Sequence, residues 1–472
     1  MAIVRPVVAH RALDVPAGRL ARVIASWPEP ALLESGPGFG ASGRWSILVA
    51  RPRLVFEATG SDWSLRSDSR PGDSGTGGPL RVLAHLLRLH GLAEPDEMPG
   101  PDLPPFQGGM IGFLGYDLAT QLERLPRKAP RDSRLPDIRM ALYDTIVTLD
   151  HASGAIELWA FDLLDEGAAA AEARCRAWRR ALDRERPAPI RSSRLRPLES
   201  NFRPDAYLDA VARSLEYIRA GDIFQVNLSQ RFAAHGRPEP LHLYLRLKAR
   251  SPAPFAAYLR WGDLAVLSAS PEWFYQTRGD RLVTRPIKGT RPRGATPEED
   301  ARLAAELASS PKDRAELTMI VDLERNDLGR VGQYGTVRVI GPLAVETFAQ
   351  VHHLVATVEG RLRPGAGPID VVRALFPGGS ITGAPKIRAM EIIDELEPTR
   401  RSLYTGAIGY FSRGGTSGFN IAIRTLLVEG DRVSYQVGGG VVADSDPEAE
   451  YRETLHKGRG LRAVIEDEGG AP

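Results

Sequence analysis

Residues 404–438 read YTGAIGYFSRGGTSGFNIAIRTLLVEGDRVSYQVG and contain three strand-like stretches joined by short turns. The stretches cover residues 404–412, 417–427 and 432–438, and their β-branched and aromatic residues are typical of strands. Because consecutive strands joined by short turns pair in antiparallel fashion, this segment predicts an antiparallel β-sheet.

The same pattern extends through the chain after residue 204. Further strands are expected at 255–261, 264–270, 281–287, 335–341 and 351–361. Helical periodicity predicts helices at about 204–221, 297–309, 312–328, 368–375, 385–397 and 447–466. The sequence therefore predicts the α+β class, with large antiparallel β-sheets packed face to face in a sandwich and helices on the outside.

The first half of the chain is expected to mix strands and helices. Strands are predicted within 44–58 and 138–163, a short helix at 79–92, and a flexible loop at 66–79. The stretch 184–204 is rich in proline, serine and arginine and has no apolar period, which is typical of a boundary. The predicted organisation is an N-terminal region, 1–190, and a second region, 200–468, that carries the candidate site.

Composition excludes several classes of function. The 472 residues are 43% hydrophobic and carry a formal net charge of +2, which argues against a general binder of nucleic acids. A single cysteine, Cys175, excludes an intramolecular disulfide and a thiolate zinc cluster. The sequence has neither the apolar centre of a signal peptide nor a run long enough to span a membrane, so we expect a cytoplasmic protein.

Lys288 stands in TRPIKGTRPR (284–293), at the end of a predicted strand where an ionised amine is costly. The ordinary interpretation is a lysine whose amine extends to water, and residue type alone favours it. The alternative is a nucleophile whose pKa is lowered by its surroundings. Arg285, Arg291 and Arg293 would lower that pKa if they lie near the amine.

Two predicted helices carry carboxylates at helical spacing. Glu316 shares a stripe with apolar residues on the helix 312–328, and Glu450, Glu453 and Lys457 share one face of the last helix. A salt bridge or a solvated charged face explains each pattern as well as a ligand site does. Glutamates on two helices would also suit Mg²⁺, which binds one or two carboxylates and completes its shell with substrate and water.

Glycine-rich segments predict an anion site. In FPGGSITGAPK (376–386), Thr382 and Gly383 directly precede a helix start, and Gly438 and Gly439 end a strand. A tight turn and a β-bulge are the ordinary interpretations. Arg424, on a predicted strand face of small residues, suits a bidentate bond to a carboxylate. Tyr410 lies on a neighbouring strand, and His353 is a candidate acid or base that is more often structural.

Together these segments resemble the family of chorismate-utilising enzymes, whose fold is that of anthranilate synthase component I. Its members include aminodeoxychorismate synthase component I and the isochorismate and salicylate synthases. The resemblance is carried by SASPEWF (268–274), TRPIKGTRPR, KDRAELTMIVDLERNDLGRV (312–331), VHHLVATVEG (351–360), FPGGSITGAPKIRAMEIIDELEP (376–398), GAIGYF (406–411), NIAIRTL (420–426) and GGGVVADSDPEAEYRETLHK (438–457). LLESG (32–36) and FQGGMIGFLGYD (106–117) extend it into the first half.

The resemblance implies a role for each candidate residue. Anthranilate synthases typically have alanine where this chain has Lys288, so the lysine is similar to the covalent nucleophile of the aminodeoxychorismate synthase branch. Glu272 would protonate the leaving hydroxyl, and His353 would move a proton or orient a group. Substrate chorismate would be held by Thr382, Gly383, Tyr410, Arg424, Gly438, Gly439 and Lys457. Mg²⁺ would be held by Glu316 and Glu453, with Glu450 acting through water.

The resemblance also implies partners. Cys175 is not in a glutaminase-like motif, so ammonia would come from a separate glutamine amidotransferase subunit. A tryptophan pocket is expected at Leu33, Glu34, Ser35, Arg44, Pro254 and Phe255, and the sequence leaves open whether tryptophan regulates, stabilises or does not bind. The alternatives are anthranilate synthase component I, an enzyme supplying both pathways, and a non-catalytic tryptophan-binding subunit, which the intact candidate residues disfavour.

Overall fold

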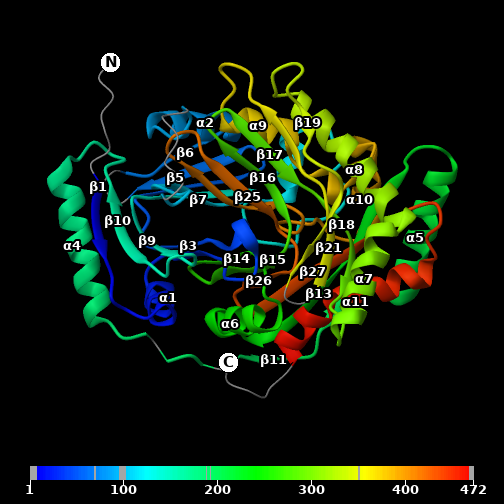
Figure 1. Ribbon diagram of the computed structural model, residues 1–472, viewed down its shortest axis with the longest axis horizontal. Helices are drawn as coiled ribbons and strands as arrows, with labels where there is room; N and C mark the ends of the chain where they lie inside the picture. Colours follow the sequence, from blue (N-terminus) through cyan, green and yellow to red (C-terminus); the bar gives the residue numbers. More distant parts are fainter. Residues whose placement is uncertain are drawn as a thin grey trace.

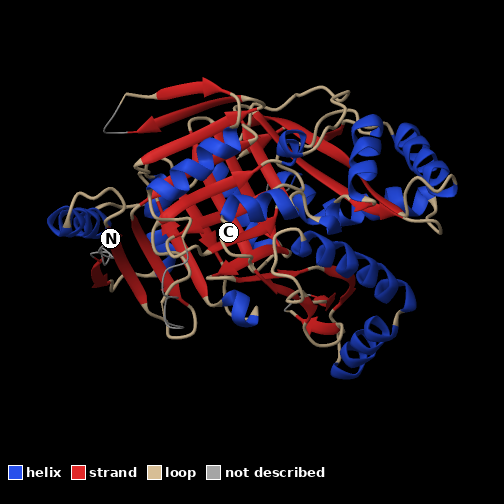
Figure 2. Cartoon of the chain, turned by 90° about the horizontal axis from the view of Figure 1, so that it is seen from above, coloured by secondary structure: helices blue, strands red, loops and turns tan. Residues whose placement is uncertain are grey.

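Two large antiparallel sheets form the centre of the computed structural model, which describes residues 8–67, 71–94, 103–187, 189–191, 193–348 and 351–466 (Figure 1). Their inner faces share one apolar core, in which Val49 and Val266 from the first sheet meet Phe56 and Ile111 from the second. Helices lie on the outside of the sheets (Figure 2). The predicted α+β class and sandwich are confirmed.

The first sheet contains strands from both halves of the chain. In order across the sheet these are β1 (Val8–Ala12), β10 (Ile156–Phe161), β9 (Thr145–Asp150), β3 (Trp45–Val49), β2 (Ala31–Glu34), β14 (Phe255–Trp261), β15 (Leu264–Ser270), β26 (Thr425–Glu429), β27 (Arg432–Val441), β13 (Gln225–Arg237) and β11 (Arg194–Leu195). The short strands β12 (Glu199–Ser200) and β23 (Gly383–Ala384) also pair with β13.

The second sheet is likewise shared between the two halves. Its order is β19 (Arg338–Val339), β22 (Val358–Arg361), β17 (Arg281–Arg285), β16 (Trp273–Arg278), β25 (Ser417–Ile421), β24 (Ala407–Ser412), β7 (Gly109–Leu114), β8 (Ile138–Tyr143), β4 (Leu54–Thr59), β5 (Asp62–Ser67) and β6 (Asp73–Thr76). A small third sheet has the order β18 (Ile287–Pro292), β21 (Val351–Val355) and β20 (Ala344–Thr347). Strands of the predicted regions 1–190 and 200–468 thus pair within the same two sheets, although a polar stretch separates the two regions in the sequence.

The longer helices cover the sheets. They are α1 (Ala17–Ser26), α2 (Pro79–Leu89), α4 (Ala168–Arg184), α5 (Pro204–Arg219), α6 (Pro240–Arg250), α7 (Pro297–Ser309), α8 (Pro311–Gly329), α9 (Pro368–Leu375), α10 (Lys386–Leu396) and α11 (Pro447–Glu466). Seven of them lie close to the predicted bounds, and for the three at 17–26, 168–184 and 240–250 no bounds were predicted. Cys175 is buried on α4. No helix within the described ranges is long and apolar enough to cross a membrane.

Three predicted strands break where the chain passes from one sheet to another. The stretch 281–287 ends at β17, and β18 starts after Pro286 in the small sheet. The stretch 351–361 divides into β21 and β22, and 417–427 divides into β25 and β26. Lys288, His353 and Arg424 lie at or beside these crossings, which brings residues from different sheets to one place.

The predicted loop 66–79 is partly regular. Residues 68–70 lie outside the described part of the chain, but β5 and β6 on either side pair as antiparallel strands. The glycines and serines of this segment suggested a loop because they have low strand propensity. Pairing at the edge of the second sheet overrides that propensity.

Candidate active site

A cavity of about 220 Å³ lies where the three sheets meet. Its lining includes residues of β13, β18, β21 and β27, together with the loop before α10 and the crossing between β25 and β26. Among the predicted site residues, the cavity brings together Glu272, Lys288, His353, Arg424, Gly438 and Lys457.

Lys288 is half-buried on β18, and its Nζ donates a hydrogen bond to the Ser380 carbonyl at 3.2 Å. Burial lowers the pKa of the amine, and the negative charge of Glu272 partly opposes that effect. A larger share of this amine is therefore neutral and nucleophilic than in a free lysine.

The arginines around Lys288 do not cause this shift. Arg285 pairs with Glu346, Arg293 with Asp300, and Arg291 with Glu306. The cation that does lower the lysine pKa is Lys457, from the last helix. The expectation based on Arg285, Arg291 and Arg293 is wrong, because neighbouring acids bind their guanidinium groups.

Glu272 is buried at the start of β16 and faces the same cavity. Ser380 Oγ donates a hydrogen bond to Glu272 Oε1 at 2.6 Å. Burial raises the pKa of this carboxyl, while the Ser380 bond and the charge of Lys288 oppose the rise. Ser380 thus contacts both Lys288 and Glu272, through its carbonyl and its hydroxyl respectively. Sequence reasoning selected its loop but missed this residue.

Thr382 and Gly383 shape the loop and do not line the cavity. Thr382 Oγ1 donates to the Gly378 carbonyl at 3.0 Å, within the loop itself. Gly383 has φ +143°, and a Cβ there would lie 2.2 Å from the Gln225 carbonyl. Glycine is therefore required for β23 to approach β13. Instead of these two residues, Ser380 and Ile381 line the cavity.

Arg424 occupies the crossing between β25 and β26 and not a strand face, contrary to the prediction. Its backbone has φ +50°, a conformation that non-glycine residues adopt rarely. No described residue forms a hydrogen bond or an ion pair with its guanidinium, although burial lowers the pKa of the group. A half-buried arginine that lines a cavity and has no partner among the described residues is suited to bind a carboxylate.

The tyrosine beside Arg424 is Tyr404, not Tyr410. Tyr404 lines the cavity, whereas Tyr410 lies on β24 and lines a second cavity with Pro254 and Phe255. Both tyrosines stood in the segment that predicted the sheet. Which of the two tyrosines shares the cavity with Arg424 depends on where the chain passes from one sheet to the other, and the sequence did not reveal that position.

His353 lies on β21 and lines the cavity, with its Nδ1 at 2.9 Å from Thr290 Oγ1. Burial and the charge of Arg424 lower the pKa of this imidazole to about 4. At neutral pH the ring is therefore uncharged. It can orient a group or accept a proton, but it holds no proton to donate as an imidazolium.

Glu450 and Glu453 of α11 lie beside Gly439, and neither they nor Glu316 line the cavity. A Cβ at Gly439 would lie 2.9 Å from Glu450 Oε2 and 3.5 Å from Glu453 Oε1, so glycine leaves room for both. Lys457 Nζ lies 2.6 Å from Glu453 Oε1 and donates to the Gly438 carbonyl at 3.2 Å. The charges of Glu453 and of Glu316 on α8 also act on Lys288.

These acids do not by themselves make up a metal site in the described part of the chain. Within the described ranges no three histidine, cysteine, aspartate or glutamate side chains form a ready ligand cluster. Glu450 Oε2, however, is buried without a hydrogen-bond partner, and burial raises the pKa of Glu450. An unpartnered oxygen that faces the Glu453 carboxylate fits a cation that takes its remaining ligands from substrate and water.

A second cavity, of about 300 Å³, lies at the predicted tryptophan pocket. Leu33, Glu34, Pro254 and Phe255 line it. Ser35 and Arg44 do not: the Ser35 hydroxyl donates to the Ser42 carbonyl, and Arg44 forms two hydrogen bonds of 3.1 Å with Asp150. Four of the six predicted residues are thus brought together.

Comparisons with known proteins show the family of this chain. The model of the chorismate binding enzyme family matches residues 42–463. Aminodeoxychorismate synthase component 1 of Klebsiella aerogenes is 43% identical over 92% of this chain and 93% of its own. Anthranilate synthase component 1 of Cereibacter sphaeroides is 39% identical over 97% of this chain and 93% of its own.

A solved structure shows the same fold. Anthranilate synthase component I from Streptococcus pneumoniae superposes with a TM-score of 0.79 and 31% identity, covering 91% of this chain and 93% of that one. The matched residues 42–463 include every residue that lines the cavity. The chain therefore belongs to the chorismate binding enzyme family.

Proposed function

We propose that this protein converts chorismate and ammonia to 4-amino-4-deoxychorismate, the precursor of 4-aminobenzoate and folate. The observation that supports this proposal is the amine of Lys288. It lies in the cavity with Glu272 and Arg424, and burial lowers its pKa. An amine so placed can form a covalent bond to a substrate ring, which a structural lysine at the surface could not.

Chorismate is a dianion, and the cavity offers a site for each carboxylate. Arg424 and Tyr404 would hold the enolpyruvyl carboxylate, because both line the cavity and no described residue pairs with the guanidinium. Lys457 and the backbone of Gly438 would hold the ring carboxylate at the opposite end. The two anchors would place the ring against Lys288.

The proposed reaction has two displacements. The neutral amine of Lys288 attacks ring carbon 2, the ring double bonds shift, and the hydroxyl on carbon 4 leaves as water with a proton from Glu272. Ammonia then attacks carbon 4, and the electrons return to expel the lysine. The raised pKa of Glu272 and its contact with Ser380 support its role as the acid. Ammonia would come from glutamine through a partner amidotransferase subunit.

Mg²⁺ is proposed as the cofactor. Glu316 and Glu453 would hold it directly, and Glu450 through water. When bound, it supplies positive charge that offsets the ring carboxylate and draws electron density from the ring. The unpartnered Oε2 of Glu450 supports this assignment.

Changing Glu453 to glutamine should weaken Mg²⁺ and chorismate binding together. We expect the Mg²⁺ concentration for half-maximal rate to rise by about 10-fold or more, since a ligand charge is lost. Glu448→Gln on the same helix is the matched control, because Glu448 is exposed and pairs with Arg452. A Mg²⁺ titration identical to that of the wild type would remove Glu453 from the metal site.

Tyr404→Phe and Tyr410→Phe distinguish the two tyrosines. Loss of the Tyr404 hydroxyl should raise KM for chorismate by about 10-fold, the cost of one hydrogen bond to a charged group. Tyr410→Phe should leave KM for chorismate within about twofold, because that hydroxyl lies at the second cavity. Steady-state kinetics on both variants provides the check, and equal effects would contradict the assignment.

A second candidate function is that of anthranilate synthase component I. Relatives with that name are 39% and 40% identical over 97% and 96% of this chain, so similarity alone does not choose between the products. The second cavity, which four of the predicted tryptophan residues line, also fits a tryptophan-binding regulatory site. Lys288 favours the first candidate, because an anthranilate-forming reaction needs no amine there.

Product identification tests the proposal. The purified chain is incubated with chorismate, an ammonium salt at alkaline pH and Mg²⁺, and products are separated with mass detection, with and without an aminodeoxychorismate lyase. Aminodeoxychorismate that the lyase converts to 4-aminobenzoate is the expected result. Anthranilate and pyruvate would overturn the proposal and assign the chain to tryptophan synthesis.

A further inference from the structure

Arg401 lies behind the cavity wall and contacts several of its parts without lining the cavity itself. Its side chain is 1% exposed and pairs with Glu397, whose side chain is 2% exposed, at 2.7 Å. The guanidinium also donates to the carbonyls of Ile381 and Asn227, at 3.2 and 2.5 Å, and to Thr405 Oγ1 at 3.2 Å. All three acceptors belong to residues that line the cavity.

Glu397, the partner of Arg401, forms hydrogen bonds with residues on two further strands beside the cavity. Its Oε1 accepts hydrogen bonds from the backbone N–H and the hydroxyl of Ser229, at 2.9 and 2.6 Å. Gln436, a lining residue on β27, donates to Ser229 Oγ at 2.8 Å and to Glu397 Oε2 at 3.4 Å. Arg401 and Glu397 therefore connect β13, β27 and two loops around one cavity.

The loop that carries Tyr404 needs such a restraint. Ser402 and Thr405 have φ values of +54° and +59°, in the left-handed region that residues other than glycine seldom adopt. Backbone strain of this kind persists only where the surroundings fix it. Arg401 provides that restraint through Thr405 Oγ1, and its guanidinium lies 5.5 Å from the centre of the Tyr404 ring.

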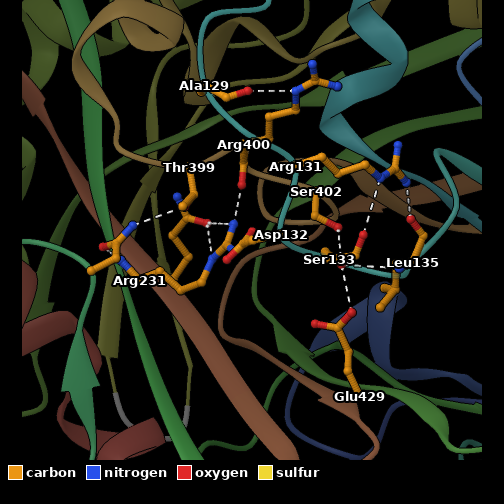
Figure 3. A network of polar contacts seen from close by, with 12 residues as sticks. Ala129, Arg131, Asp132, Ser133, Leu135, Arg231, Thr399, Arg400, Ser402 and Glu429 are labelled. Carbon is orange, nitrogen blue, oxygen red and sulfur yellow. Dashed lines mark hydrogen bonds and ion pairs between the residues drawn. The ribbon is translucent and has the colours of Figure 1, made fainter.

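Both neighbours of Arg401 in the chain are anchored as well (Figure 3). The Arg400 carbonyl accepts a hydrogen bond from Arg231 of β13, and Ser402 Oγ donates to Ser133 Oγ at 3.1 Å. Ser133 in turn donates to Glu429 Oε1 at 2.9 Å. These hydrogen bonds hold the backbone on both sides of Arg401.

We propose that Arg401, paired with Glu397, is a positioning residue: it holds the Ser380–Ile381 loop, which contacts Lys288 and Glu272, at a set distance from Tyr404 and Arg424. Arg401 donates to the Ile381 carbonyl, and the adjacent Ser380 contacts Lys288 and Glu272. It also donates to Thr405, which follows Tyr404 in the chain. The inference rests on the proposed function, because that reaction needs the Lys288 amine to lie at the correct distance from the bound ring. A shift of about 1 Å in such a geometry costs about 10²-fold in rate.

The test compares Arg401→Lys with Arg139→Lys. Arg139 is the matched control, since it is 2% exposed and pairs with Glu29 and Glu57 but does not line or brace the cavity. In both variants lysine keeps the positive charge, but its amine cannot form the several hydrogen bonds of the planar guanidinium group. We measure kcat and KM from chorismate consumption, so the result does not depend on which product forms, together with the Kd for chorismate and the melting temperature.

We expect Arg401→Lys to lower kcat by about 10- to 100-fold while KM and Kd for chorismate change less than about threefold. Arg139→Lys should lower the melting temperature and leave kcat within about threefold. Equal kcat values in the two variants, or a loss of kcat matched by an equal loss of binding, would overturn the proposal. The double variant Arg401→Met/Glu397→Gln removes both charges and repeats the test if lysine does not fold.

Deuterium exchange separates this inference from the proposed function. Arg401→Lys should speed amide exchange in segments 378–384 and 402–406, and Arg139→Lys should not. If the wild type consumes no chorismate, the proposed function fails and this exchange pattern decides the inference. Unchanged exchange in both segments would overturn it.

Discussion

Changing Lys288 to alanine should abolish amination of chorismate, with a fall in kcat of at least about 10³-fold. The physical reason is that no other amine has this environment. Lys457 also lines the cavity, but its Nζ is bound to Glu453 at 2.6 Å. The fold should persist, since the Lys288 amine makes one hydrogen bond of 3.2 Å in the described part of the chain. Product analysis and circular dichroism provide the two measurements.

A chemical rescue makes this prediction sharper. Lys288→Cys, treated with 2-bromoethylamine, regains a side chain of lysine length that ends in an amine. The treatment is selective because the chain has one cysteine of its own, Cys175, which is 1% exposed. We expect the unmodified variant to be inactive and the aminoethylated one to recover a measurable rate. Full activity of Lys288→Ala would rule out the covalent step.

Much of the fold could be predicted because its signals are local. The helices at 297–309, 368–375 and 447–466 and the strands at 255–261 and 264–270 have the predicted bounds. Each has its periodicity, its cap or its turn within a few residues. The short connections predicted antiparallel sheets, and this inference needs no knowledge of the strand order.

The passage of strands between sheets could not be predicted. The stretch 417–427 reads as one strand, yet β25 and β26 belong to different sheets and Arg424 stands between them. Nothing in the local composition marks this crossing, because it is fixed by the partners β16 and β15 on either side. The same limit explains why Tyr410 was preferred to Tyr404.

The second limit on prediction from the sequence was the pairing of charged side chains. The arginines of the candidate segments look alike in the sequence, but Arg285, Arg291 and Arg293 are bound to acids and Arg424 is not paired within the described ranges. The roles proposed for the charged groups of the candidate site come from the resemblance to a family. Ser380 and Arg401 were missed because their roles depend on contacts between elements far apart in the chain.

Glu272→Gln should lower kcat by about 10²- to 10⁴-fold, the range for loss of a general acid. Glutamine keeps the shape of the side chain and still accepts the Ser380 hydrogen bond, but it has no proton to give to the leaving hydroxyl. In the wild type, kcat/KM should fall as the pH rises through the pKa of Glu272, because the protonated carboxyl is the active form. Burial raises that pKa, which moves the fall towards neutral pH. The glutamine variant should lack this part of the profile.

Glu324→Gln is the matched control for this prediction. Glu324 is also buried, accepts a hydrogen bond of 2.5 Å from Thr284, and does not line the cavity. Burial raises its pKa to about 8, so at neutral pH it is already largely uncharged and glutamine replaces it closely. We expect kcat within about threefold of the wild type and an unchanged pH profile. If the two variants lose activity equally, burial of a carboxyl and not proton transfer explains the effect, and Glu272 is not the acid.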